Sequence, residues 1–108
     1  MKVFVIERHG NADYCSLDKI AEDFQISKQT ARSRVNEIRH EIVKRRYPKL
    51  AIIDDENIVR VNRLVFIDYM TNRQMLKSET QRKYVDKYDP VKISKNLGYY
   101  ETRKEAEE

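Results

Sequence analysis

The chain is organised around residues 17–46, which read LDKIAEDFQISKQTARSRVNEIRHEIVKRR. Two groups of apolar residues in this stretch recur at the three- and four-residue spacing of a helical face. These groups are Leu17, Ile20, Ala21 and Phe24, followed by Ala31, Val35, Ile38 and Ile42. Ser16 and Ser27 stand before the two groups, where a serine oxygen accepts a backbone N–H and starts a helix. Only Gln25 and Ile26 separate Phe24 from Ser27, so the sequence predicts a helix-turn-helix.

The second predicted helix carries a polar, basic face opposite its apolar stripe. At 100° per residue, the outward positions are Gln29, Arg32, Ser33, Asn36 and His40, flanked by Lys28, Arg39 and Arg46. Residues 28–46 hold seven Lys or Arg against two Glu, a net charge of +5, whereas the whole chain carries +4. The positive charge is therefore concentrated on one predicted helix, as a helix that enters a DNA groove requires.

Two interpretations of this helix compete with DNA binding. A charged face on an isolated helix usually reflects only exposure to solvent, and some helix-turn-helix units contact only protein. Here the caps, the short break, the small Ala21 and the outward face agree with one another, which favours DNA binding. Arg and Lys match guanine edges, while Gln and Asn match adenine edges.

Composition limits the remaining possibilities. The chain has 108 residues, 37% of them charged and 40% apolar, with no Trp, which predicts one domain with a modest core and no buried catalytic cavity. The single Cys15 excludes an internal disulfide and fits a reducing cytosol. No apolar run approaches the ~20 residues that cross a membrane, and the start of the chain lacks a signal-peptide core. We therefore expect a cytoplasmic protein, acting at the nucleoid if the cell is bacterial.

The segments on either side of the helix-turn-helix predict a small antiparallel sheet. Residues 2–7, KVFVIE, read as a strand and leave no room for a leading helix. The groove helix is expected to end near Arg46, because Pro48 cannot continue it. The β-prone runs 50–53 and 58–61 then predict a hairpin, which is a wing, and we expect the N-terminal strand to join it as a third strand.

The predicted wing has an acidic tip. Residues 54–57 are Asp, Asp, Glu and Asn, and phosphates repel three carboxylates. Any contact of the wing with phosphate is therefore expected from Arg60 and Arg63, on the return strand and just beyond it.

The rest of the chain predicts a third helix and a C-terminal extension. Asn62 caps residues 63–76, whose apolar residues cover more than one side, so this helix is expected to close the core. Residues 77–108 form a basic extension, with a short helix between Pro90 and Gly98 and a frayed acidic tail, ETRKEAEE. The predicted division is thus a DNA-binding domain, residues 1–76, and this extension.

No catalytic or metal-binding pattern is found in the sequence. His9 and His40 lie on different elements without metal-ligand spacing, and two glycines cannot form a phosphate-binding loop. We expect a protein that is not an enzyme and needs no cofactor.

The run AEDFQISKQTARSRVNEI resembles the bacterial helix-turn-helix pattern. Its packing positions are Ala21, Phe24, Ile26, Ala31 and Val35, and it departs from the pattern at Gln25, where glycine is usual. The order of elements over residues 16–70 is similar to the winged-helix excisionases and small regulators of phages and conjugative elements. The resemblance implies an α+β fold, a winged helix-turn-helix with a small antiparallel sheet, here followed by the helical C-terminal segment.

The resemblance also implies a function without chemistry. Such proteins bind and bend DNA near an attachment region or promoter, and they recruit an integrase or repress transcription. By position, Lys28, Gln29, Arg32, Ser33 and Asn36 would make the base and phosphate contacts. The full predicted DNA-binding set is Ser27, Lys28, Gln29, Arg32, Ser33, Asn36, Arg39, His40, Arg46, Arg60 and Arg63.

The expected partners are double-stranded DNA, an integrase or another phage protein, and a second copy of the chain. One recognition helix reads about half a dozen base pairs, so we expect a homodimer or self-association on DNA. The alternative is an adaptor or antirepressor that binds another protein through the third helix and the tail.

Overall fold

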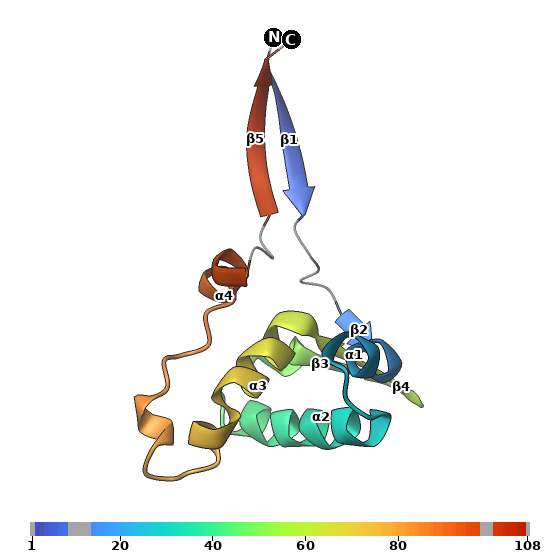
Figure 1. Cartoon of the computed structure of the whole chain (residues 1–108), viewed down its shortest axis with the longest axis vertical. Coiled ribbons are helices and arrows are strands. Elements are labelled where there is room, and N and C mark those ends of the chain that lie inside the picture. Colours follow the sequence, from blue (N-terminus) through green and yellow to red (C-terminus); the bar gives the residue numbers. More distant parts are fainter. Residues whose placement is uncertain (1, 9–13, 98–100, 108) are drawn as a thin grey trace.

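The computed structural model describes residues 2–8, 14–97 and 101–107, which form an α+β structure (Figure 1). Its helices are α1 (Leu17–Phe24), α2 (Lys28–Val43), α3 (Arg63–Leu76) and α4 (Pro90–Leu97), with 3₁₀ turns η1 (Lys49–Ala51) and η2 (Arg82–Tyr84). Its strands are β1 (Lys2–Arg8), β2 (Tyr14–Ser16), β3 (Ile52–Asp55), β4 (Ile58–Asn62) and β5 (Glu101–Glu107). No helix within the described ranges is long and apolar enough to span a membrane.

The turn between α1 and α2 has the geometry that the serine caps predict. Ser16 Oγ accepts the N–H of Lys19 at 3.1 Å, and Ser27 Oγ accepts the N–H of Thr30 at 3.0 Å. Gln25 adopts the left-handed conformation, with φ 55° and ψ 46°. The N–H of Ile26 then donates to the carbonyl of Ala21 at 3.0 Å, which is the Schellman helix ending. The turn therefore forms although Gln25 replaces the usual glycine.

Helix α2 ends at Val43, before the predicted end near Arg46. Arg45 adopts a left-handed conformation with φ 68°. The N–H of Arg46 donates to the carbonyl of Glu41 at 3.0 Å, so this end is also a Schellman motif. The helix thus stops ahead of Pro48, and the chain turns back toward the core.

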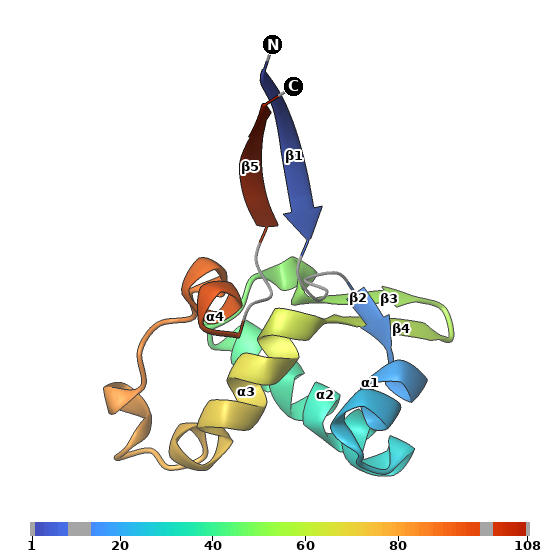
Figure 2. The same cartoon turned by 45° about the horizontal axis from the view of Figure 1, so that its top comes forward.

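The sheet has the strand order β2–β4–β3, and both pairs are antiparallel (Figure 2). The predicted hairpin is confirmed, with Glu56 at φ 54° in the turn between β3 and β4. Val61 lies between Cys15 and Ile52 in the register, and all three side chains are buried. The prediction that the N-terminal strand joins the hairpin was wrong, because the third strand is β2.

The N-terminal strand pairs with the end of the chain instead. β1 and β5 form an antiparallel ribbon that pairs Lys2 with Glu107 and Arg8 with Glu101. The ribbon projects from the helices and brings the two chain ends together (Figure 1). The predicted frayed tail was therefore also wrong, since residues 101–107 form a strand.

Helix α3 occupies the centre of the core, as its apolar composition predicts, and it begins and ends at the expected residues. Asn62 Oδ1 accepts the N–H groups of Leu64 and Val65, at 3.0 and 3.2 Å. Phe66 packs edge-to-face on Phe24 of α1, with ring centroids 4.9 Å apart. On the opposite side, α4 packs against α3, so the helix is covered by more than one neighbour.

Candidate nucleic-acid interface

A groove of about 440 Å³ lies between α2 and the β3–β4 hairpin. One wall comes from α2, and the other comes from the hairpin and the start of α1. The groove brings together five of the predicted DNA-binding residues, which are Lys28, Arg32, Asn36, Arg39 and Arg60. They come from two elements separated in sequence, and the fold gathers them on one surface.

The buried stripe of α2 determines which of its side chains face outward. Ala31, Val35 and Ile38 are at most 2% exposed, so the side chains on the other side of the helix lie in solvent. The predicted residues of α2 and its cap that are exposed are Ser27, Lys28, Gln29, Arg32, Ser33, Asn36 and His40.

The cations of the groove differ in how far they are already neutralised. Lys28 Nζ lies 3.1 Å from Asp18 Oδ1, but both side chains are more than half exposed, so this pair is weak. The side chain of Arg32 forms no ion pair or hydrogen bond within residues 14–97. The guanidinium of Arg60 donates only to the carbonyl of Val59, at 3.3 Å, in the same part of the chain. Arg32 and Arg60 are therefore available to a phosphate or a base edge.

Arg39 is engaged by the hairpin. Its Nη1 and Nη2 donate to Asp54 Oδ2 and Oδ1 at 2.6 and 2.7 Å, a bidentate pair between α2 and β3. The hydrogen bond from Arg39 holds the pKa of Asp54 below its usual range. One of the three predicted tip carboxylates thus faces the helix, while Asp55 and Glu56 remain exposed.

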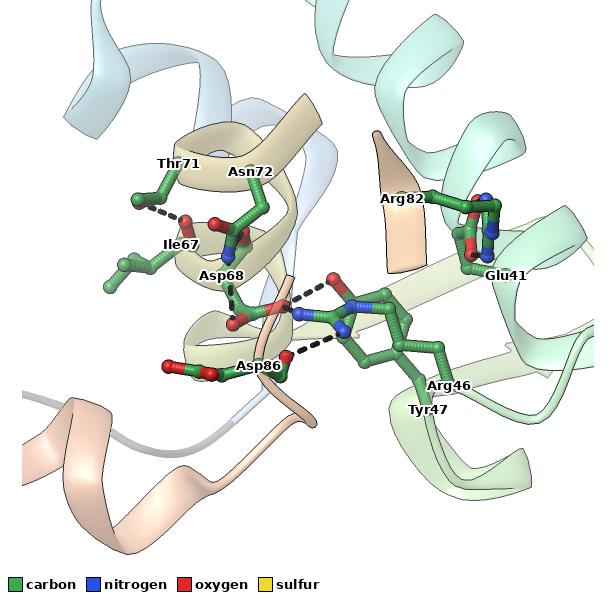
Figure 3. Close-up of polar contacts among 9 residues, drawn as sticks. All are labelled: Glu41, Arg46, Tyr47, Ile67, Asp68, Thr71, Asn72, Arg82 and Asp86. Atoms are coloured by element: carbon green, nitrogen blue, oxygen red, sulfur yellow. Dashed lines mark hydrogen bonds and ion pairs between the residues drawn. The ribbon is translucent and has the colours of Figure 1, made fainter. Parts of the chain in front are cut away.

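Arg46 does not belong to this surface, which corrects its predicted role. Its side chain is 9% exposed, and Nη2 donates to Asp68 Oδ2 at 2.7 Å (Figure 3). Tyr47 Oη donates to the same oxygen at 2.6 Å, and Arg46 Nη1 donates to the carbonyl of Asp86 at 2.9 Å. Burial and the neighbouring Asp68 raise the pKa of Tyr47, so its hydroxyl stays protonated and donates. The early end of α2 explains why Arg46 turns inward.

Arg63 is likewise corrected to a buried position. Its Nη2 donates to Asp23 Oδ2 at 2.6 Å and to Cys15 Sγ at 3.2 Å. The hydrogen bond from Arg63 lowers the pKa of Asp23. This cation therefore joins α3 to α1 and β2, and it does not face a DNA backbone.

Helix α2 is held against α3 by a network around Glu37. Glu37 accepts from Arg34 at 2.8 Å, from Arg73 at 3.1 Å and from Tyr69 at 3.2 Å. Burial opposes ionisation of Glu37, but the hydrogen bond from Arg34 and the charge of Arg73 outweigh it and lower the pKa. The contacts from Tyr69 and Arg73, which come from α3, hold the rotation of α2 and with it the direction of the outward face.

A second hollow, of about 260 Å³, lies on the other flank of α2 and contains His40. Lys44 and Lys77 also line it, and neither was predicted to contribute. The spacing of Lys28, Arg32, Asn36, His40 and Lys44, four residues apart, is the sequence signal that includes Lys44. Such a row winds slowly around the helix, so its two ends face opposite flanks.

Comparisons with protein-family models, curated protein sequences and solved structures found no match to this chain. No group of three or more His, Cys, Asp or Glu in the described part of the chain is arranged to hold a metal ion. The interpretation of this surface therefore rests on its own geometry and charge.

Proposed function

We propose that this protein is a winged helix-turn-helix protein that binds double-stranded DNA sequence-specifically and performs no catalysis. Helix α2 would enter the major groove, and the β3–β4 hairpin would be the wing. The observation that supports this most is the groove in which α2 and the hairpin bring Lys28, Arg32, Asn36 and Arg60 together.

The dimensions of α2 suit this role. Its 16 residues make a helix about 24 Å long and, with side chains, about 10–12 Å wide. The major groove of B-DNA is about 12 Å wide and admits one helix. The buried stripe and the Glu37 network leave the polar side of α2 outward, so docking needs no rearrangement of the core.

The proposed contacts divide into base recognition and phosphate binding. Arg32 and Asn36 lie one turn apart on the exposed side, where Arg suits guanine and Asn suits adenine. Lys28 and Arg60, which also line the groove, would bind phosphates and set the register on the duplex. Gln29, Ser33 and His40 are the other exposed polar residues of α2.

The biological role that we propose is that of a transcriptional regulator or an excisionase-like accessory factor of a mobile element. Both roles begin with the same binding step, and self-association on repeated half-sites would extend the short site that one helix reads. The adaptor alternative has less support, because seven residues of α3 are buried and α4 packs on this helix.

Selection of bound duplexes from a random pool, with the full chain, tests the proposal. We expect an enriched sequence, and an affinity for it that falls steeply with salt as phosphate counterions are released. Arg32→Ala or Asn36→Ala should each weaken binding to the selected site by about 1–3 kcal/mol. Lys95→Ala, which removes an exposed cation on α4, is the matched control and should change little.

Two results would contradict the proposal. A pool without enrichment, together with no salt-dependent binding to any duplex, would reject DNA binding. Normal binding by both the Arg32 and Asn36 variants would show that α2 does not read the bases.

A further inference from the structure

The feature that goes beyond DNA binding itself is the ion pair that joins the hairpin to the recognition helix. Val59 packs against the core, and Asp54 lies opposite it in the β3–β4 register, so both face α2. There Asp54 meets both terminal nitrogens of Arg39, at 2.6 and 2.7 Å. The two side chains are 50% and 38% exposed, so the pair lies at the surface beside the groove.

A bidentate pair fixes direction as well as distance. The planar guanidinium and the planar carboxylate meet through two parallel hydrogen bonds, which restricts the angle between the elements that carry them. Arg39 belongs to a helix whose rotation is held by the hydrogen bonds of Arg73 and Tyr69, on α3, to Glu37. The pair therefore joins the hairpin directly to α2, beside the groove that Arg32 and Arg60 both line.

The charges of the hairpin also weaken its attraction to the phosphate backbone of any DNA sequence. Asp54 neutralises Arg39, which removes one cation from the groove, and the exposed Asp55 and Glu56 add negative charge at the hairpin turn. Binding to random DNA depends almost wholly on phosphate neutralisation. A wing of this charge weakens the attraction to phosphate that random and selected duplexes share, so this charge alone does not change the ratio of the two affinities.

We propose that Arg39 and Asp54 are a positioning pair that confers selectivity: it holds the hairpin at one angle to α2 and keeps the Arg39 charge from random DNA. This inference rests on the proposed function. It predicts an unusual result, in which the loss of one surface carboxylate strengthens binding to random DNA and weakens discrimination between sequences.

Asp54→Asn in the full chain tests the inference, with Asp55→Asn as the matched control. The two variants change the charge equally on adjacent residues, but only Asp54 holds Arg39. Affinities would be measured for the selected duplex and for a random duplex of equal length, each at several salt concentrations. If Asp54→Asn frees Arg39 for one phosphate, the salt slope on random DNA should steepen by about 0.9, and random-DNA affinity near 0.1 M salt should rise about tenfold.

The ratio of the two affinities separates position from charge. We expect Asp54→Asn to lower this ratio about tenfold, and Asp55→Asn to preserve it. Arg39→Gln should lower the ratio without steepening the salt slope, because it frees no cation. Exchange of the two groups, Arg39→Asp with Asp54→Arg, restores the pair in reverse and should restore the ratio.

Three outcomes would overturn the inference. Equal effects of Asp54→Asn and Asp55→Asn would leave only a charge effect and no positioning role. A salt slope that becomes shallower by about 0.9 in Arg39→Gln would make Arg39 a phosphate contact. Failure of the unaltered chain to bind any duplex would reject the proposed function and this inference together. If the unaltered chain binds normally, either of the first two results rejects this inference alone.

Discussion

Replacing Asp68 with alanine should destabilise the fold strongly, because this carboxylate holds three groups. The side chain of Asp68 is 7% exposed. Its Oδ2 accepts hydrogen bonds from Arg46 Nη2 and Tyr47 Oη, at 2.7 and 2.6 Å, and its Oδ1 accepts one from Asn72 Nδ2 at 3.2 Å (Figure 3). In Asp68→Ala the guanidinium of Arg46 stays buried and keeps the carbonyl of Asp86 as a partner. Breaking a buried ion pair from one side costs about 3–5 kcal/mol.

This cost is large relative to the stability of such a chain. A domain of this size unfolds with about 5–15 kcal/mol. With an unfolding entropy of about 2.1 cal/mol/K per residue over 108 residues, 3–5 kcal/mol lowers the melting temperature by roughly 13–22 °C. Thermal melting followed by circular dichroism would measure the shift.

Asp86→Ala is the matched control. The backbone carbonyl of Asp86 accepts from Arg46 and is retained in alanine, while the side chain is 91% exposed. We expect its unfolding free energy to change by no more than about 0.5 kcal/mol. If Asp68→Ala melts within a few degrees of the unaltered protein, or if the two variants lose equal stability, the buried ion pair does not hold the fold as inferred.

Three further predictions concern helices α1 and α2. Gln25→Gly should raise the unfolding free energy in urea by about 0.5–1 kcal/mol, because a left-handed residue with a Cβ is strained; a loss of stability would contradict the turn geometry. Ala31→Glu places a charge at a fully buried position and should abolish the cooperative thermal transition. Ser33→Glu, on the exposed face, is the control and should melt normally. An unchanged transition in Ala31→Glu would mean that the helix faces are assigned wrongly. The unfolding free energy should fall as the pH drops below about 4, because Glu37 has a lower pKa in the folded state than in the unfolded chain and therefore stabilises the fold only when ionised. Glu37→Gln should make this fall shallower. An equal fall in both proteins would exclude Glu37 as a source of the pH dependence.

The local elements of the fold were largely predictable from the sequence. Serine caps and apolar spacing located α1 and α2, and Asn62 located the start of α3, because these signals act within a few residues. The hairpin followed from two β-prone runs around a polar turn. These predictions depend on backbone geometry that neighbouring residues determine directly.

Pairing between distant segments was not predictable in the same way. The charged sequence of β5 has no alternation of apolar residues, and an N-terminal strand carries no local mark of its partner. The same limit applies to the cations. From sequence spacing alone, Arg46 and Arg63 looked as exposed as Arg32. Only their tertiary contacts with Asp68 and Asp23 show that these two arginines are buried.

The ribbon of β1 and β5 has a consequence for the order in which the chain assembles. In an unfolded chain, pairing Lys2 with Glu107 would close a loop of almost the entire sequence, at an entropic cost of about 4 kcal/mol for ~100 residues. Two strands alone are only marginally stable in water. The ribbon should therefore form after the helices have brought Arg8 and Glu101 close together. Its amide hydrogens should then exchange with solvent through local opening, at rates that do not follow the global stability of α2 and α3.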